Sequence, residues 1–206
     1  MDTVKLCEIL SAMSKRMEKE KDWLTELDNE IADGDHGINM ARGFAAVEQK
    51  LSELSDKDIK TVLKTVGMTV VSAVGGSAGP LYGTAFMKSG MAMDGKTDMD
   101  IDDFIVCLKE SIDGIMMRGK AVKGEKTMLD AMIPAYEAIK EARANGLDVK
   151  EIIESGVKAS WDGAEYTKSI AATKGRASYI GERSIGHMDP GAASFSCLLE
   201  VIKEEI

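Results

Sequence analysis

The sequence is poor in aromatic residues, proline and cysteine, and it has no excess of positive charge. Aromatic residues make up 5% of its 206 residues and there are three prolines, which favours a helical fold over a sheet-rich one. The formal net charge of −9 excludes a general binder of nucleic acid or of anionic membrane surfaces. No segment approaches the run of about eighteen apolar residues that a membrane-spanning helix needs.

The three cysteines, Cys7, Cys107 and Cys197, are far apart, and each lies in an apolar periodic segment. They match neither a disulfide framework nor a zinc-binding spacing, so we interpret them as small core residues in a reducing compartment. The N-terminus lacks the long apolar stretch of a signal peptide. We therefore expect a cytoplasmic protein with neither a nucleic-acid nor a membrane partner.

Apolar residues recur at helical spacing along the whole chain. Residues 3–30 predict one helix with a charged face, or two helices with a break in the polar run 15–22. Ser55 with Asp58 and Thr127 with Asp130 resemble capping boxes, and Asp189-Pro190 is typical of a helix start. The pattern predicts about eight helices and no strand. We expect an all-α protein in which residues 1–206 form a single domain.

An acidic turn with Asp28, Asp33 and Asp35 is the strongest local feature. Asp28 and Asp33 would point to different sides of one unbroken helix, and the Asp-Gly pair at 33–34 is a turn signal, so we expect the helix to break after about residue 32. Carboxylates this close repel one another unless they share a cation, and oxygen ligands suit Mg²⁺ or Ca²⁺. Counted from Asp33, Ile38 and Phe44 stand where a calcium hand needs Gly and Glu, so that motif is excluded. Helix capping and turn formation are an alternative reason for these aspartates, and both interpretations stay open.

Other segments give weaker signals. Gly75–Gly83 could cradle a phosphate through backbone N–H groups, or it could be a tight turn between packed helices. Arg176 and Arg183 lie in a glycine-rich segment, where either arginine could clamp a phosphate. The aspartate-rich run 94–103 is typical of a solvated loop and helix start. With two histidines, His36 and His187, and no nucleophile grouping, we expect no protein nucleophile.

Four segments taken in order resemble the nucleotide-binding L subunit of bacterial dihydroxyacetone kinase, of the phosphotransferase-coupled type. They are Leu27-Asp28 with Asp33–Asn39, Gly75–Gly83, Gly124–Asp130, and Lys174–Tyr179 with Asp189–Gly191. The resemblance covers nearly the whole chain. It departs from the family pattern at Ala78, where serine is common, and at Glu125, where aspartate is common.

The resemblance implies an eight-helix barrel or bundle with a nucleotide-magnesium site at one end. Asp28, Asp33 and Asp35 would hold two Mg²⁺ ions, and Arg176 would reach the phosphates of ADP or ATP. The remaining residues of the implied nucleotide site are His36, Gly37, Ile38, Asn39, Ser77 and Ala78 at the phosphates, Gly119, Met128 and Leu129 at the adenine, and Asp189, Pro190 and Gly191 closing over the nucleotide.

The resemblance also implies a function. The chain would transfer the γ-phosphoryl group to dihydroxyacetone held on a partner K subunit, and a phosphohistidine-carrying phosphotransferase subunit would recharge the bound ADP. A homodimer is a further assembly to consider. The alternatives are a nucleotide-binding regulatory module of the same fold, a stand-alone Mg²⁺-dependent phosphohydrolase, and a kinase subunit serving a close analogue such as erythrulose.

Overall fold

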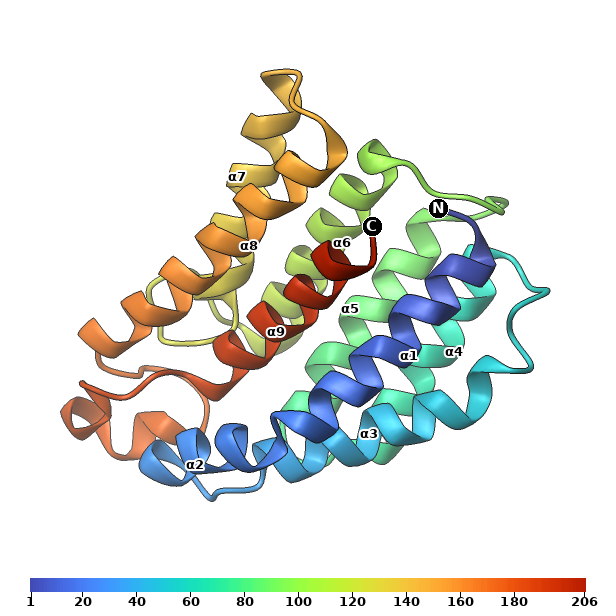
Figure 1. Cartoon of the computed structure of the whole chain (residues 1–206). Coiled ribbons are helices and arrows are strands. Elements are labelled where there is room, and N and C mark those ends of the chain that lie inside the picture. The colour runs from blue at the N-terminus through green and yellow to red at the C-terminus, as the bar shows by residue number, and fades with distance from the viewer. The chain divides into compact units, whose positions relative to one another are not determined.

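The computed structural model describes residues 1–206 and is built from helices without strands (Figure 1). An isolated bridge pairs Asp2 with Asp98. The all-α prediction is confirmed. The α-helices are α1 (Thr3–Lys19), α2 (Lys21–Ile31), α3 (His36–Leu51), α4 (Ile59–Ala73), α5 (Ala78–Ala92), α6 (Ile101–Gly119), α7 (Leu129–Ala144), α8 (Val149–Tyr166) and α9 (Pro190–Glu205), and the 3-10 helices are η1 (Thr167–Ser169), η2 (Arg176–Tyr179) and η3 (Gly181–Ser184).

There are nine α-helices rather than about eight, because the stretch 3–30 divides in two. α1 ends at Lys19 and α2 begins at Lys21, and the backbone of Glu20 between them leaves the helical conformation with ψ near 3°. The break lies in the polar run 15–22, where few apolar side chains hold a continuous helix against a core. Of the two alternatives that the sequence left open, the structure has two helices.

The chain falls into two compact units, each assembled from two separate stretches. The first unit contains residues 1–19 and 39–119, and the second contains residues 20–38 and 120–206. The boundary at residues 38 and 39 lies inside α3, so this helix starts in the second unit and continues in the first. That residues 1–206 form a single domain stays a prediction.

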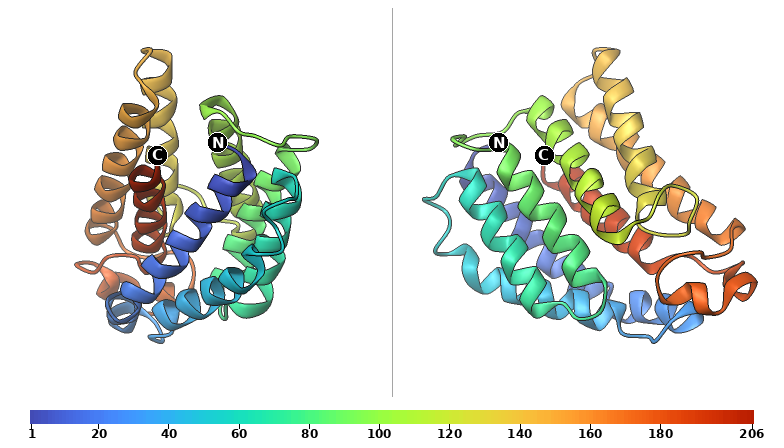
Figure 2. Two further views of the ribbon diagram at one scale, coloured as in Figure 1. Left: turned by 45° about the vertical axis from the view of Figure 1, so that its right-hand side comes forward. Right: turned by 180° about the vertical axis from the view of Figure 1, so that it is seen from behind.

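In the first unit, α4 packs against α5 and α5 packs against α6 (Figure 2). The rings of Phe44 on α3 and Phe86 on α5 meet edge to face with 6.3 Å between their centroids. Cys7 and Cys107 are free thiols buried in this unit, as expected of small core residues. Cys197 is likewise free and buried, in the second unit. No helix of the chain has the length and apolar character needed to cross a membrane.

In the second unit, α8 packs against both α7 and α9, and α2 also contacts α9 (Figure 1). Residues 192–199 of α9 are all buried, so this helix is covered on every side along its first half. Trp23 on α2 and Trp161 on α8 lie 6.3 Å apart between ring centroids. The start of α9, which carries three of the predicted site residues, is therefore anchored in the core of its unit.

Two predicted helix starts have different outcomes. The capping box at Ser55 is wrong: α4 begins at Ile59, and the carboxylate of Asp58 accepts the N–H of Thr61 at 2.6 Å. The apolar pattern starts only at Ile59, so the cap lies directly before it. The start at Asp189-Pro190 is confirmed, because the Asp189 carboxylate accepts the N–H of Ala192 at 2.7 Å.

Candidate functional site

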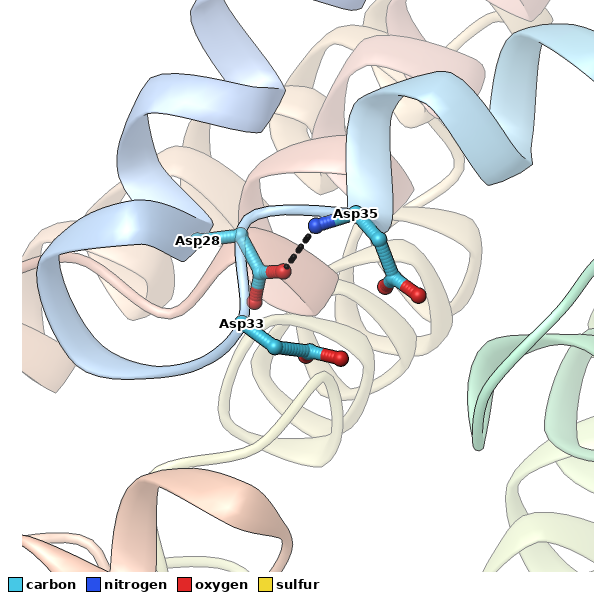
Figure 3. Close-up of side chains that lie close together, drawn as sticks. All are labelled: Asp28, Asp33 and Asp35. Atoms are coloured by element: carbon cyan, nitrogen blue, oxygen red, sulfur yellow. Dashed lines mark hydrogen bonds between the residues drawn. The ribbon is translucent and has the colours of Figure 1, made fainter.

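The three aspartates of the acidic turn converge in the second unit (Figure 3). Asp28 lies in the last turn of α2, and Asp33 and Asp35 lie in the turn before α3. The helix ends at Ile31, which confirms the predicted break, and Gly34 turns the chain with a φ of +70°. One carboxylate oxygen from each aspartate lies within 4.8 Å of the others. Residues that one straight helix would separate thus face a common space.

Asp28 is the fixed member of this cluster. Its side chain is 6% exposed, and its Oδ2 accepts the backbone N–H groups of Asp35 at 2.9 Å and His36 at 3.1 Å. Burial raises the pKa of Asp28, and the charges of Asp33 and Asp35 raise the pKa further, against the lowering effect of the two N–H bonds. Its ionised form is therefore unfavourable in the fold until a positive charge compensates it.

Arg176 places one positive charge beside Asp33, another member of the cluster. Its Nη1 lies 2.5 Å from Oδ2 of Asp33, and both side chains are more than a third exposed. An exposed pair of this kind is screened by solvent and is worth little on its own. Three carboxylates and one guanidinium leave a net charge of −2 in the turn. The sequence predicts Arg176 at a phosphate, whereas the structure pairs this residue with one of the predicted metal ligands.

The acidic cluster fits a hard divalent cation. All three donors are carboxylates, with no thiolate or imidazole among them, and Mg²⁺ and Ca²⁺ prefer oxygen ligands. Oxygens that share one Mg²⁺ lie about 3–4 Å apart, as expected for metal-oxygen bonds of about 2.1 Å, so a small closing movement from 4.8 Å suffices. Asp28 holds its own orientation through backbone N–H groups, which leaves its second oxygen available for a metal.

His36, the first residue of α3, connects the acidic turn to α9. Its Nε2 lies 2.9 Å from Oγ of Ser194, and that hydroxyl donates to the carbonyl of Gly191 at 3.1 Å. Since the hydroxyl has one proton and gives it to Gly191, Nε2 of His36 is the donor in the first bond. Burial lowers the pKa of His36 to about 4, so the imidazole is neutral at physiological pH.

Gly37 and Ile38 follow in the first turn of α3. A Cβ atom on Gly37 would lie 2.0 Å from the carbonyl oxygen of Lys21, so glycine lets this turn pack directly on α2. The side chain of Ile38 is 49% exposed. Packing against α2 therefore explains why residue 37 is a glycine, independently of the phosphate contact that the resemblance implies.

Met128 and Leu129 lie at the start of α7 and are almost fully buried. A Cβ atom on Gly191 would lie 3.4 Å from Cβ of Met128, so the predicted adenine segment and the start of α9 are in contact. Burial raises the pKa of Asp189 to about 7, against the lowering effect of its bond from Ala192. Within the second unit, the structure therefore brings together His36, Met128 and residues 189–191.

Four predicted nucleotide contacts belong to the first unit. Asn39 accepts a hydrogen bond from Nη2 of Arg42 at 2.6 Å, and it borders the glycine loop, because a Cβ atom on Gly75 would lie 2.9 Å from its Oδ1. Ser77 precedes α5, Ala78 is its first residue, and Gly119 is the exposed last residue of α6. Contacts of Asn39, Ser77, Ala78 and Gly119 with a nucleotide stay predictions.

Three buried polar residues near the predicted site had no predicted role in it: Ser194, Asp130 and Lys126. Ser194 holds His36, and Asp130 accepts the N–H groups of Gly124 and Thr127. Lys126 is 1% exposed and donates to two backbone carbonyls. The predicted capping box of Thr127 and Asp130 is only partly confirmed: Asp130 accepts the N–H of Thr127, but α7 begins at Leu129 with Met128 as its N-cap. A lysine in a glycine-rich segment gave no signal of its burial. His187 contacts Glu30 with 2.5 Å between Nδ1 and Oε2.

Comparison with known proteins adds to this geometry. The DAK2 domain family matches residues 30–204. The chain is 42% identical over 183 residues to the ADP-binding subunit DhaL of the PEP-dependent dihydroxyacetone kinase of Escherichia coli, covering 89% of this chain and 87% of that protein. It is also 42% identical over 208 aligned residues to the ADP-binding subunit DhaL of PEP-dependent dihydroxyacetone kinase 2 of Listeria innocua, covering 100% of this chain and 96% of that protein.

Among solved structures, the dihydroxyacetone kinase of C. freundii in complex with AMP-PNP and Mg²⁺ matches with a TM-score of 0.75 and 21% identity. The match covers 97% of this chain and 33% of the kinase chain, so this chain spans about a third of that protein. At this identity the likeness concerns the fold. The match over residues 30–204, together with the two relatives, identifies the family: the chain belongs to the DAK2 domain family.

Proposed function

We propose that this chain is the ADP- and Mg²⁺-binding subunit of a dihydroxyacetone kinase, transferring the γ-phosphoryl group to dihydroxyacetone held on a partner K subunit. The observation that carries the proposal is the acidic turn, in which three carboxylate oxygens converge within 4.8 Å around a partly compensated charge. The relatives named as ADP-binding subunits support the nucleotide, and the C. freundii complex with AMP-PNP and Mg²⁺ supports the metal.

The negatively charged turn can bind a nucleoside diphosphate only if cations lie between its carboxylates and the phosphates. ADP carries about three negative charges, and the three aspartates add three more, so the turn repels ADP directly. Two Mg²⁺ ions bound by Asp28, Asp33 and Asp35 would neutralise phosphoryl oxygens as charge develops on them. Arg176, paired with Asp33 through an exposed contact, can exchange that carboxylate for a phosphate oxygen at little cost.

Each of the chain's own residues then has a defined task. Asp28 keeps one orientation through its two backbone N–H bonds. Neutral His36 ties the start of α3 to α9, so the two helix starts keep a fixed distance. Helix N-termini attract anions, and the start of α9 borders Met128, where we place the adenine. Phosphoryl transfer depends mainly on such positioning and charge stabilisation, and no nucleophile of this chain takes part.

The relatives' description as PEP-dependent supports a phosphoryl donor outside the chain, which we take to be a phosphohistidine-carrying phosphotransferase subunit. ADP would then remain bound and act as a coenzyme. The cytoplasmic location and the homodimer considered from the sequence belong to the same proposal. Erythrulose in place of dihydroxyacetone remains an alternative, because the acceptor would be held on the partner.

Mass spectrometry and metal analysis of the purified chain test the binding site directly. We expect ADP with two Mg²⁺ per chain. Phosphoryl transfer to dihydroxyacetone, and to erythrulose in parallel, is then measured with and without the K subunit and the phosphohistidine protein. Transfer that needs both partners supports the proposal. Steady release of phosphate from small phosphoesters by the chain alone would favour a phosphohydrolase, and bound ADP without any transfer would favour a regulatory module.

A further inference from the structure

Lys126 combines two costly features in the loop before α7. Its side chain is 1% exposed, although an ammonium group is expensive to bury unless it is paired and hydrogen-bonded. Its φ is +61°, a left-handed conformation that residues other than glycine seldom adopt. Burial lowers its pKa, while the charges of Asp189 and Asp130 favour the charged form. A residue that only filled space at this position would need neither a charged group nor a left-handed backbone conformation.

The ammonium group of Lys126 joins two loops that are far from it in sequence. It donates to the carbonyl of Thr167 at 2.5 Å and to the carbonyl of His187 at 2.5 Å. An ammonium group has three N–H donors, so these bonds use two of them. One side chain therefore holds the end of α8 and the segment before α9.

The Thr167 bond leads directly to the start of α9. The Thr167 hydroxyl accepts the backbone N–H of Asp189 at 2.9 Å, and it donates to the carbonyl of Ala164 at 2.6 Å. Asp189 in turn caps α9 through the N–H of Ala192. Thr167 thus accepts two hydrogen bonds: its hydroxyl accepts the N–H of Asp189, and its carbonyl accepts the ammonium group of Lys126. A shift of the lysine would move the cap of α9.

The backbone on both sides of Lys126 is held as tightly as its side chain. The buried carboxylate of Asp130 accepts the N–H groups of Gly124 and of Thr127, the latter at 2.8 Å. The next residue, Met128, borders Gly191 of α9. The lysine therefore lies at the junction between the start of α7 and the start of α9.

The His187 bond extends this network to the acidic turn. The backbone carbonyl of His187 accepts a hydrogen bond from Lys126, and the imidazole Nδ1 of His187 contacts the carboxylate of Glu30 at 2.5 Å. Glu30 lies in the last turn of α2, two residues after Asp28. The His187 contact ends in an exposed pair with Glu30, so it should constrain the position of the acidic turn less than the buried Thr167 contact constrains the start of α9.

We propose that Lys126 is a positioning residue for the nucleotide: by holding the Thr167 and His187 carbonyls, it fixes the start of α9 against Met128. The inference rests on the proposed function, since it assigns Met128 and residues 189–191 to ADP. Lys126 acts through these segments and not by touching the nucleotide. A role limited to stabilising the fold is the alternative that the experiment must separate.

The test compares Lys126→Met, which keeps the volume and removes the charge and donors, with Lys123→Met in the same loop. Lys123 is an exposed residue that pairs with Glu137 at 3.1 Å, so it controls for loss of a lysine from this segment. ADP affinity is measured by calorimetry in saturating Mg²⁺, well below the thermal midpoint of each variant. Mn²⁺ binding without nucleotide, followed by electron paramagnetic resonance, reports on the acidic turn alone.

We expect Lys126→Met to weaken ADP binding about 10- to 100-fold, the size of loss found when residues that orient metal ligands are replaced. Mn²⁺ binding should stay within about twofold, because the bonds that orient Asp28 do not involve Lys126. Lys123→Met should match the wild type in both measurements. Unchanged ADP affinity in Lys126→Met, or an equal loss of ADP and Mn²⁺ binding, overturns the inference and leaves the proposed function intact.

If the wild-type chain shows no Mg²⁺-dependent ADP binding, the proposed function fails and the inference fails with it. If Lys126→Met does not fold, Thr167→Val decides, because it keeps the volume and removes the hydroxyl that accepts the N–H of Asp189. A folded Thr167→Val variant with weaker ADP binding and normal Mn²⁺ binding supports the positioning role. Wild-type ADP affinity in that variant overturns it.

Discussion

Replacing Asp28 by asparagine should stabilise the protein without metal and destabilise it with metal and nucleotide. The asparagine keeps an oxygen that accepts the N–H groups of Asp35 and His36, so the change removes mainly the charge. Burial raises the pKa of Asp28 above its usual value of 3.8, which means that the ionised carboxylate opposes folding at neutral pH. The Asp28→Asn variant lacks this penalty.

The repulsion within the turn sets the size of the effect. Two unit charges 4.8 Å apart repel by about 1 kcal/mol at the dielectric constant of water and by about 3.5 kcal/mol at an effective value of 20. Arg176 compensates Asp33, so Asp35 is the main unbalanced neighbour. Loss of charge-assisted strength in the two N–H bonds offsets part of the gain. We expect a net gain of about 1 kcal/mol, or about 2–4 °C in thermal midpoint for a chain of this size.

Adding ligand should reverse the order of stability. At a concentration 100 times its Kd, a ligand that binds only the folded state stabilises it by about 2.7 kcal/mol. The wild-type chain gains this stabilisation from Mg²⁺ and ADP, whereas Asp28→Asn has lost the ligand that the turn orients best. Thermal unfolding is measured in excess EDTA and again in saturating Mg²⁺ and ADP. Asp22→Asn, an exposed change in the first turn of α2, is the control.

Two results would refute this reasoning. A lower midpoint for Asp28→Asn in EDTA would show that its carboxylate supports the fold without a cation. An equal gain for both proteins on adding Mg²⁺ and ADP would show that Asp28 is not a ligand. The metal-free difference should also disappear as the pH falls toward 4, where the carboxylate of the unfolded chain takes up its proton.

Three further predictions concern the same unit. Excess EDTA should release bound ADP, as measured by gel filtration with detection at 260 nm; ADP that remains on the protein would contradict the two-metal arrangement. Asp33→Ala should lose ADP binding and transfer to dihydroxyacetone together, in a coupled assay with partner subunits, whereas retained transfer would mean that other carboxylates hold the metal. In EDTA, the stability of the wild-type chain relative to Asp189→Asn should fall as the pH rises from about 4 to 7, by at most about 1.4 kcal/mol per pH unit, because burial raises the pKa of Asp189 to about 7. The variant keeps the helix cap, and the comparison cancels the opposite contribution of His36, whose pKa is lowered to about 4, and that of Asp28. Urea unfolding of both proteins measures the difference; a difference that does not change with pH would contradict the raised pKa of Asp189.

The parts of the fold that the sequence predicted depend on local rules. Helical periodicity, the Asp189-Pro190 start and the break after residue 32 need only neighbouring residues, and all three are confirmed. The wrong cap at Ser55 has the same origin, since Ser55 and Asp58 are both good N-cap residues and the choice depends on where packing begins.

Only part of the site could be predicted from local rules. The aspartates of the turn are close in sequence, so their convergence could be predicted from spacing and the Asp-Gly turn. The burial of Lys126, its bonds to the Thr167 and His187 carbonyls, and the pairing of Arg176 with Asp33 join residues separated by 41 or more positions. No periodic or motif signal specifies such contacts, because they depend on how distant segments pack, and the carbonyls that Lys126 binds are present in every residue type.

The construction of the second unit from residues 20–38 and 120–206 has a consequence for the order of events during synthesis. The acidic turn leaves the ribosome early, but its guanidinium partner Arg176 follows 143 residues after Asp33, and Ser194 follows His36 by 158. At about 5–20 residues per second, the turn waits about 7–30 s for its counter-ion. The Mg²⁺ that we propose for the finished site would also shield the charges of the nascent turn in that interval.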